Sequence, residues 1–123
     1  MARILITCWG SYGDINPCVG LALALRARGH QPVMAGPSSM SDYVGGAGIA
    51  YTPIRPSVDR KGIGAALGAV DWVRTGIRDS YEDLRALAPD FDLIVTQPST
   101  LAGPIVAEQL GIRWVSSVLS PLS

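Results

Sequence analysis

The residue types best suited to chemistry lie in one short segment near the N-terminus, Gly10-Ser11-Tyr12-Gly13-Asp14. The segment follows an apolar run from Arg3 to Cys8, so we expect it to connect a buried strand to a helix. Free backbone N–H groups at a helix start stabilise anions. A carboxylate at Asp14 would therefore stay ionised and accept a proton near neutral pH, as a general base must. The alternative is structural, because an acid at a helix start also stabilises that helix.

The same segment departs from the common nucleotide-binding motifs. Gly10 and Gly13 do not complete the pattern G-x-G-x-x-G. The expected second strand ends in Ala35-Gly36, where a ribose-binding enzyme needs Asp or Glu. Asp14 would also repel a pyrophosphate placed at the same helix start. Since the phosphate-loop pattern G-x-x-x-x-G-K-[ST] does not occur either, the sequence argues against both the NAD-binding and the P-loop classes.

Two further places carry candidate binding residues. Thr96, Gln97 and Ser99 follow an expected strand, where they would line an acceptor or donor cleft. For Ser99 the alternative is a helix N-cap. Trp72 lies in a stretch with helical periodicity. If exposed, it would suit an apolar acceptor, and otherwise it belongs to the core.

The elements that must position these residues alternate along the chain. Short apolar runs predict strands, and apolar positions at helical spacing predict helices. The first helix is expected to begin at Pro17, with Asn16 as its N-cap, and to stop at Gly29. The expected strands are Arg3–Cys8, Pro32–Ala35, Ile49–Pro53, Leu93–Val95 and Trp114–Val118. The expected helices are Val19–Arg28, Ser41–Ala47, one or two within Ile63–Ala88, and Leu101–Leu110. This alternation predicts an α/β fold, a three-layer, Rossmann-like, doubly wound parallel sheet of about five strands.

Composition excludes several classes of protein. The chain has 123 residues, 48% of them hydrophobic, and a formal net charge of zero. These values argue against a disordered segment and against a nucleic-acid-binding protein. The two cysteines, Cys8 and Cys18, are too few for a disulfide scaffold and are expected to be free and buried. With His30 as the only histidine, no metal site is predicted. Apolar runs are too short for a signal peptide or a membrane span, so the predicted location is cytoplasmic.

A family resemblance adds to this interpretation. The segment from Ile4 to Pro17, followed by Gly20-Leu21-Ala22 and by Arg26-Ala27-Arg28-Gly29-His30, resembles the start of family 1 glycosyltransferases of the GT-B fold. The resemblance is to the bacterial branch that glycosylates glycopeptides, sterols and lipids and opens with G-S-x-G-D-x-x-P. Leu101–Ile112 and Leu119–Leu122 resemble later parts of the same domain.

The resemblance implies an inverting, metal-independent transfer of a hexose from a nucleoside-diphosphate sugar to the hydroxyl of a lipid, sterol or natural product. The sugar nucleotide is a co-substrate, and no cofactor is implied. Asp14 falls where that family keeps its base. Ser11 and the N–H groups of Gly10 and Gly13 would lie near the donor, and Trp72, Thr96, Gln97 and Ser99 near the acceptor. The chain departs from the family at Trp9 and Tyr12, where the motif varies.

The resemblance also bears on domain organisation. Residues 1–123 are expected to form a truncated N-terminal, acceptor-side domain, inactive without the C-terminal domain that binds the sugar nucleotide. That domain would come from a longer chain or a partner subunit. One alternative is a non-catalytic Rossmann-like module that binds a nucleotide or a partner, and another is one subunit of a split glycosyltransferase. The open end after the fifth strand would favour a homodimer or association with the missing half.

Overall fold

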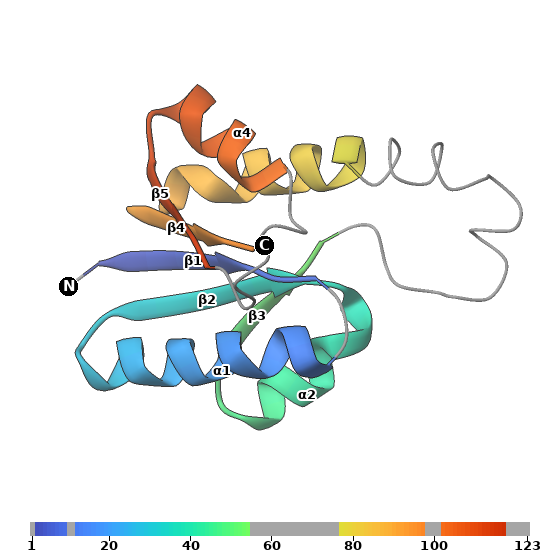
Figure 1. The fold of residues 1–123 in the computed structure, drawn as a ribbon, viewed down its shortest axis with the longest axis vertical. Coiled ribbons are helices and arrows are strands. Elements are labelled where there is room, and N and C mark those ends of the chain that lie inside the picture. The colour runs from blue at the N-terminus through green and yellow to red at the C-terminus, as the bar shows by residue number, and fades with distance from the viewer. Residues whose placement is uncertain (1, 10–11, 55–76, 98–101, 118–123) are drawn as a thin grey trace, which may run out of the picture.

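The computed structural model describes residues 2–9, 12–54, 77–97 and 102–117, with the backbone alone for residues 12–14. Strands and helices alternate through these ranges (Figure 1). The strands are β1 (Arg3–Thr7), β2 (Gln31–Gly36), β3 (Ala50–Pro53), β4 (Leu93–Thr96) and β5 (Arg113–Ser116). The helices are α1 (Tyr12–Ala27), α2 (Ser41–Gly46), α4 (Ala102–Leu110) and a helix over residues 77–87, with short 3-10 turns at Ser38–Met40 and Ala88–Asp90.

The described strands form one five-stranded sheet in the order β3-β2-β1-β4-β5. Every neighbouring pair is parallel. The chain builds outward from β1 to β3 on one side, then crosses back to place β4 and β5 on the other. The strand order therefore reverses between β1 and β4, as in doubly wound Rossmann-like sheets. This arrangement confirms the predicted fold class.

The central strand β1 is buried on both faces because its side chains alternate between two cores. Ile4 and Ile6 belong to a cluster that includes residues of α1 and α2. Leu5 points the other way, into a cluster that includes residues of the helix over 77–87 and of α4. In Figure 1 these two pairs of helices lie on opposite sides of the sheet. The continuous apolar run predicted such a two-sided strand.

The start of α1 differs from the prediction. The helix begins at Tyr12, so Pro17 lies inside it rather than at its first position. A proline there removes one helical hydrogen bond, to the carbonyl of residue 13. Packing accounts for the longer helix, because Ile15 is fully buried in the same cluster as Cys18, one turn further on. Asn16 is not the N-cap, and its side-chain oxygen accepts a hydrogen bond from the Tyr43 hydroxyl of α2.

The other boundaries follow the prediction closely. Gly29 follows α1 with a φ of 87°, a left-handed conformation that glycine adopts without steric cost. Next to it, His30 has a structural contact, since its Nδ1 accepts the backbone N–H of Ala2. Of the helical stretch predicted between Ile63 and Ala88, residues 77–87 are helical. Ala88 begins the 3-10 turn that follows, and residues 63–76, with Trp72, lie outside the described residues.

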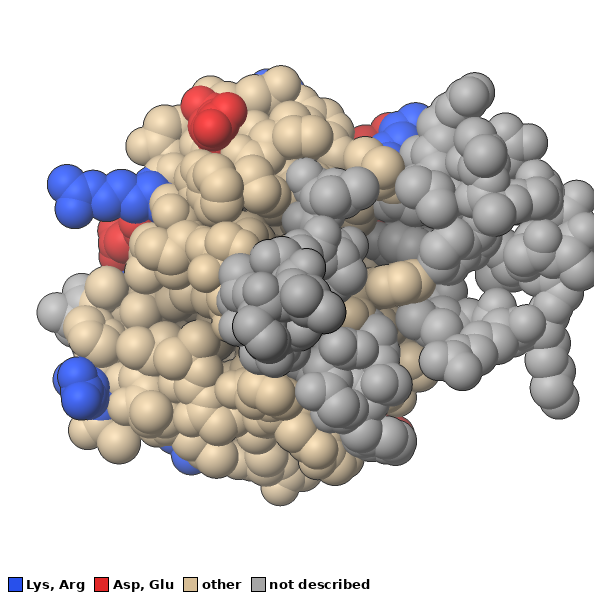
Figure 2. Space-filling model, viewed as in Figure 1, with Lys and Arg blue, Asp and Glu red and all other residues tan. Residues whose placement is uncertain are grey.

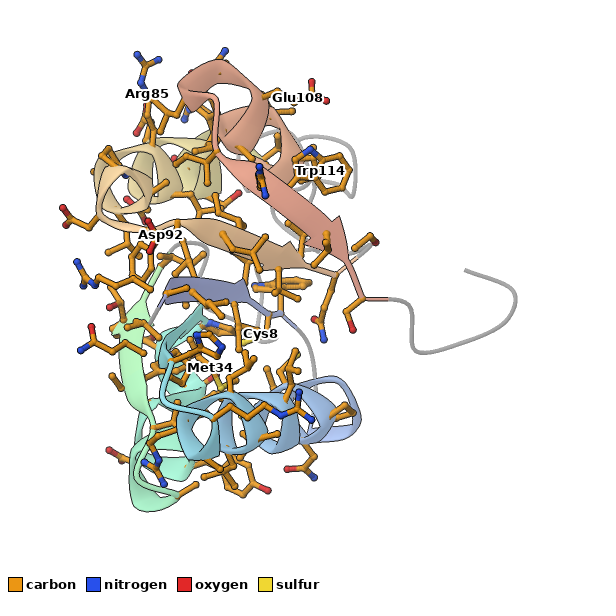
Figure 3. The ribbon with its side chains drawn as sticks, turned by 90° about the vertical axis from the view of Figure 1, so that its left-hand side faces the viewer. Cys8, Met34, Arg85, Asp92, Glu108 and Trp114 are labelled. Carbon is orange, nitrogen blue, oxygen red and sulfur yellow. The ribbon has the colours of Figure 1, made fainter. Side chains whose placement is uncertain are left out.

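The strand β5 forms one edge of the described sheet and pairs only with β4. All four of its residues are exposed, including two large apolar ones, Trp114 and Val115. Figure 3 shows Trp114 beside β5, on the outside of the molecule. The predicted exposure of apolar side chains at this end of the sheet is therefore present in the described residues.

Charged side chains do not gather into a patch on the face shown in Figure 2. Lys, Arg, Asp and Glu lie scattered along its margin, and the described surface between them is uncharged. This distribution matches the formal net charge of zero. On this face, the described residues form no continuous basic surface of the kind that a nucleic-acid backbone requires.

Candidate functional site

The candidate site lies at the carboxyl ends of β1 and β4. These two strands are adjacent and parallel, with Leu5 opposite Ile94 and Ile6 opposite Val95. The strand order reverses between them, and in open α/β sheets ligands bind in the crevice beyond such a reversal. Trp9 follows the end of β1, and Gln97 directly follows β4. The chain therefore leaves both strands at the same end of the sheet, through Trp9 and through Gln97.

Threonine side chains close the bottom of this site. Thr7 and Thr96, the last residues of β1 and β4, are both fully buried. The Thr7 hydroxyl donates a hydrogen bond to the backbone oxygen of Val95 at 3.3 Å, which links the two strands. The backbone oxygen of Thr96 accepts a hydrogen bond from the N–H of Ser117 at 2.7 Å. Thr96, predicted to line a cleft, is thus buried at the end of β4, and we refer to Thr7 and Thr96 together as the floor of the candidate site.

Helix α4 approaches this floor unusually closely because it carries a glycine there. A Cβ on Gly103 would lie 2.6 Å from Cγ2 of Thr96 and 3.5 Å from the Thr7 hydroxyl oxygen. Real side chains essentially never make a contact as short as the first of these. Glycine at this position therefore allows the helix to pack directly on the ends of both strands.

Gln97 connects three parts of the site. Its side chain is 4% exposed. The Oε1 atom accepts a hydrogen bond from the backbone N–H of Trp9 at 3.3 Å. The Nε2 atom donates to the sulfur of Cys18 in α1 at 3.0 Å. Both ends of the amide are thus engaged by residues that flank the Gly10–Asp14 segment.

Asp14 and Gly13 lie in the first turn of α1, which begins at Tyr12. This turn follows β1 at the strand reversal, so the backbone of Asp14 is at a helix start beside the candidate site. Both predictions for Asp14, a general base and a first-turn acid, require that placement, and it does not decide between them. Gly10, Ser11 and Ser99 lie outside the described residues.

The two cysteines border the site and are free and buried, as predicted. Cys8 and Cys18 belong to the cluster between the sheet and α1, and Figure 3 shows Cys8 and Met34 in that layer. Burial raises the pKa of the Cys8 thiol far above its ordinary value, and the neighbouring Cys18 adds to the rise. Cys8 is therefore a protonated core residue and not a nucleophile.

The contact between Gln97, Trp9 and Cys18 was not predicted. The partners are 88 and 79 residues apart in the sequence, and no local spacing relates them. The available signal was the topology of the sheet. Trp9 and Gln97 follow two strands whose carboxyl ends lie side by side at the reversal. Cys18 gave no such signal and was assigned to the core alone.

The described residues contain neither a cluster of metal-ligating side chains nor a helix that could span a membrane. Nowhere in the described ranges do three or more His, Cys, Asp or Glu side chains gather as ligands for a metal ion. None of the helices described combines the length and the hydropathy needed to cross a bilayer.

Comparisons with known proteins relate this chain to glycosyltransferases with the GT-B fold. It is 34% identical over 120 residues to the glycosyltransferase GtfE of Amycolatopsis orientalis, a match that covers 91% of this chain and 29% of that protein. It is 31% identical over 128 residues to the L-demethylnoviosyl transferase of Streptomyces niveus, covering 92% of this chain and 33% of that protein. No protein-family model matches the sequence.

Solved structures agree with the sequence matches. The glycosyltransferase SsfS6 of Streptomyces sp. SF2575 superposes with a TM-score of 0.79 at 29% identity, covering 96% of this chain and 39% of that one. The chain is therefore a homologue of GT-B glycosyltransferases, and its Rossmann-like sheet corresponds to one part of their fold. It spans about a third of the length of these two curated relatives.

Proposed function

We propose that this chain is the N-terminal, acceptor-side domain of a glycosyltransferase that uses a nucleoside-diphosphate sugar. Homology over nearly the whole chain to sugar-transferring enzymes carries the proposal. The position of the first turn of α1 at the strand reversal supports it, because an acceptor bound there would lie beside this helix start. The donor would be held mainly by a second domain, supplied by a longer chain or by a partner.

The relatives suggest the class of donor and acceptor. One is named a dTDP-epi-vancosaminyltransferase, and SsfS6 has been solved in complex with thymidine diphosphate. Others are named sterol 3-beta-glucosyltransferases. We infer a dTDP- or UDP-linked hexose as donor and a hydroxyl group of a natural product, sterol or lipid as acceptor.

The proposed reaction is a single displacement with inversion and without a metal ion. The Asp14 carboxylate takes the proton of the acceptor hydroxyl as its oxygen attacks the anomeric carbon. A new C–O bond forms while the bond from that carbon to the phosphate oxygen breaks. The nucleoside diphosphate leaves with the electron pair. Ser11 and the N–H groups of Gly10 and Gly13 are proposed to contact the phosphates or the sugar of the donor, since a helix start favours negative charge.

A transfer assay tests this function. The chain, and any longer product of the same reading frame, are incubated with dTDP- and UDP-hexoses and a panel of hydroxyl-bearing acceptors, and products are detected by mass. We expect transfer by the longer product or by the chain with its partner, and none by the chain alone. Failure of every form to transfer, with retained binding of a nucleotide, would favour the non-catalytic binding module instead.

A further inference from the structure

We propose that Gln97 is a positioning residue that joins Trp9, after the end of β1, to Cys18 of α1, and so places the helix whose first turn carries Asp14. The proposal rests on the proposed function, since it concerns the base of that reaction. Sequence reasoning placed Gln97 in contact with the acceptor. The contacts of its side chain favour a different role, because they hold the protein to itself.

The side chain of Gln97 links two parts of the protein that are separate in the sequence. Its oxygen binds the N–H of Trp9, directly before the segment, and its nitrogen binds the sulfur of Cys18, about one helical turn after Asp14. Asp14 therefore lies between two points that one side chain links. Cys18 is itself fixed in the core between the sheet and α1. Gln97 is in turn fixed by its place at the end of β4.

The two partners of Gln97 fix the orientation of its side-chain amide. A backbone N–H can only donate, so Oε1 must face Trp9 and the NH2 group must face the Cys18 sulfur. The side chain is 4% exposed, so water does not readily replace either partner. A buried polar group that loses its partner keeps its full desolvation cost. The arrangement therefore resists a shift of Trp9 relative to α1.

The link that Gln97 makes between Trp9 and α1 bears on the proposed catalysis. A general base acts only within hydrogen-bond reach of the proton it removes. A misplacement of about 1 Å can lower the rate about a hundredfold. A residue that fixes both sides of Asp14 therefore acts on the chemical step without touching the substrate. Each end of the Gln97 amide contacts the protein itself, which favours a positioning role over a contact with the acceptor.

Amide hydrogen exchange in the 123-residue chain tests the restraint without requiring any activity. Gln97→Leu removes both hydrogen bonds but keeps a side chain of similar size. Gln97→Glu keeps an oxygen that can accept the hydrogen bond from the Trp9 N–H. We expect exchange at the Trp9 amide to speed up about tenfold in Gln97→Leu and to stay slow in Gln97→Glu. The Ile54 amide, bonded to Gly36 at 2.8 Å in another part of the sheet, reports changes that are not confined to the site.

The control is Gln109→Leu, the same substitution at an exposed glutamine on α4, whose oxygen accepts from the Tyr81 hydroxyl. It should leave exchange at Trp9 unchanged. If Gln97→Leu does not fold, Gln97→Asn withdraws the amide by one methylene and makes the same comparison. Unchanged exchange at Trp9 in a folded Gln97 variant would overturn the proposal. So would a matching acceleration at Ile54, since the effect would then be global.

Kinetics separate positioning from acceptor binding. In the form of the protein that transfers sugar, Gln97→Leu should lower kcat about tenfold to a hundredfold and leave the acceptor KM within about twofold. Gln97→Glu should restore part of kcat. A raised acceptor KM with unchanged kcat would show direct contact with the acceptor and contradict the positioning role. If the unmodified protein transfers no sugar, the proposed function fails, and the exchange experiment still decides whether Gln97 holds Trp9.

Discussion

The reversal between β1 and β4 and the outer strand β5 belong to one sheet but differ in their surroundings. At the reversal, Thr7, Thr96 and Gln97 are buried, and hydrogen bonds of Thr7 and Gln97 link the two strands. On β5 every residue is exposed, and one side of the strand has no neighbour among the described residues. Among the described residues, the ends of β1 and β4 are therefore tightly packed, whereas the outer side of β5 is exposed.

The largest expected difference between the two regions is in the cost of truncating an apolar side chain. Leu5→Ala, at a fully buried position of β1, should lower the free energy of unfolding by about 3 kcal/mol. Val115→Ala, where the valine is 49% exposed on β5, should cost less than about 1 kcal/mol. Urea denaturation measures both. Equal losses would mean that β5 is covered in solution, for example by a second copy of the chain.

A second prediction tests how tightly α4 packs on the floor of the site. Gly103→Ala places a Cβ against Thr96 and should destabilise the fold by about 1–2 kcal/mol despite the better helix propensity of alanine. The control is Gly20→Ala in α1, where a Cβ meets nothing within 4 Å. That change should stabilise the fold by about 0.5–1 kcal/mol. The midpoint temperature of thermal unfolding should therefore fall for Gly103→Ala and rise for Gly20→Ala. A shift in the same direction for both variants would contradict the packing described for α4.

A third prediction concerns pH and the buried thiol beside the site. The pKa of Cys8 is raised in the folded state from an ordinary value of 9.0. The unfolded chain therefore releases this proton first, and stability falls as the pH rises above about 9, by at most about 1.4 kcal/mol per pH unit. Cys8→Ala should make this fall shallower in denaturation series between about pH 8 and pH 10.5. An identical slope in both proteins would mean that Cys8 is not buried as described.

Much of the fold was predictable because its signals are local. The run Ile4-Leu5-Ile6 identified a strand buried on both faces, and the glycine after α1 identified the end of that helix. The start of α1 was not predictable in the same way. Asn16-Pro17 is a typical helix-start signal, but burial of Ile15 extends the helix past it. Tertiary packing thus overrode a local preference.

The candidate site was predictable in place but not in detail. Parallel strands bring their carboxyl ends together, so the segments after β1 and β4 had to meet. Which atoms of Gln97 meet Trp9 and Cys18 depends on side-chain packing between distant parts of the chain. Sequence spacing carries no information about that, so Gln97 was assigned to the acceptor instead of to the scaffold.

The most direct test of the account is the turnover of an Asp14→Asn variant of the form that transfers sugar. We predict that kcat falls by about 10²–10⁴-fold while donor affinity stays within about twofold, because the variant keeps the shape of the residue and loses the base. Asp42→Asn, the same change at an exposed acid in the first turn of α2, is the control and should leave turnover unaltered. Normal turnover by Asp14→Asn would contradict the account and leave Asp14 as a first-turn acid of α1.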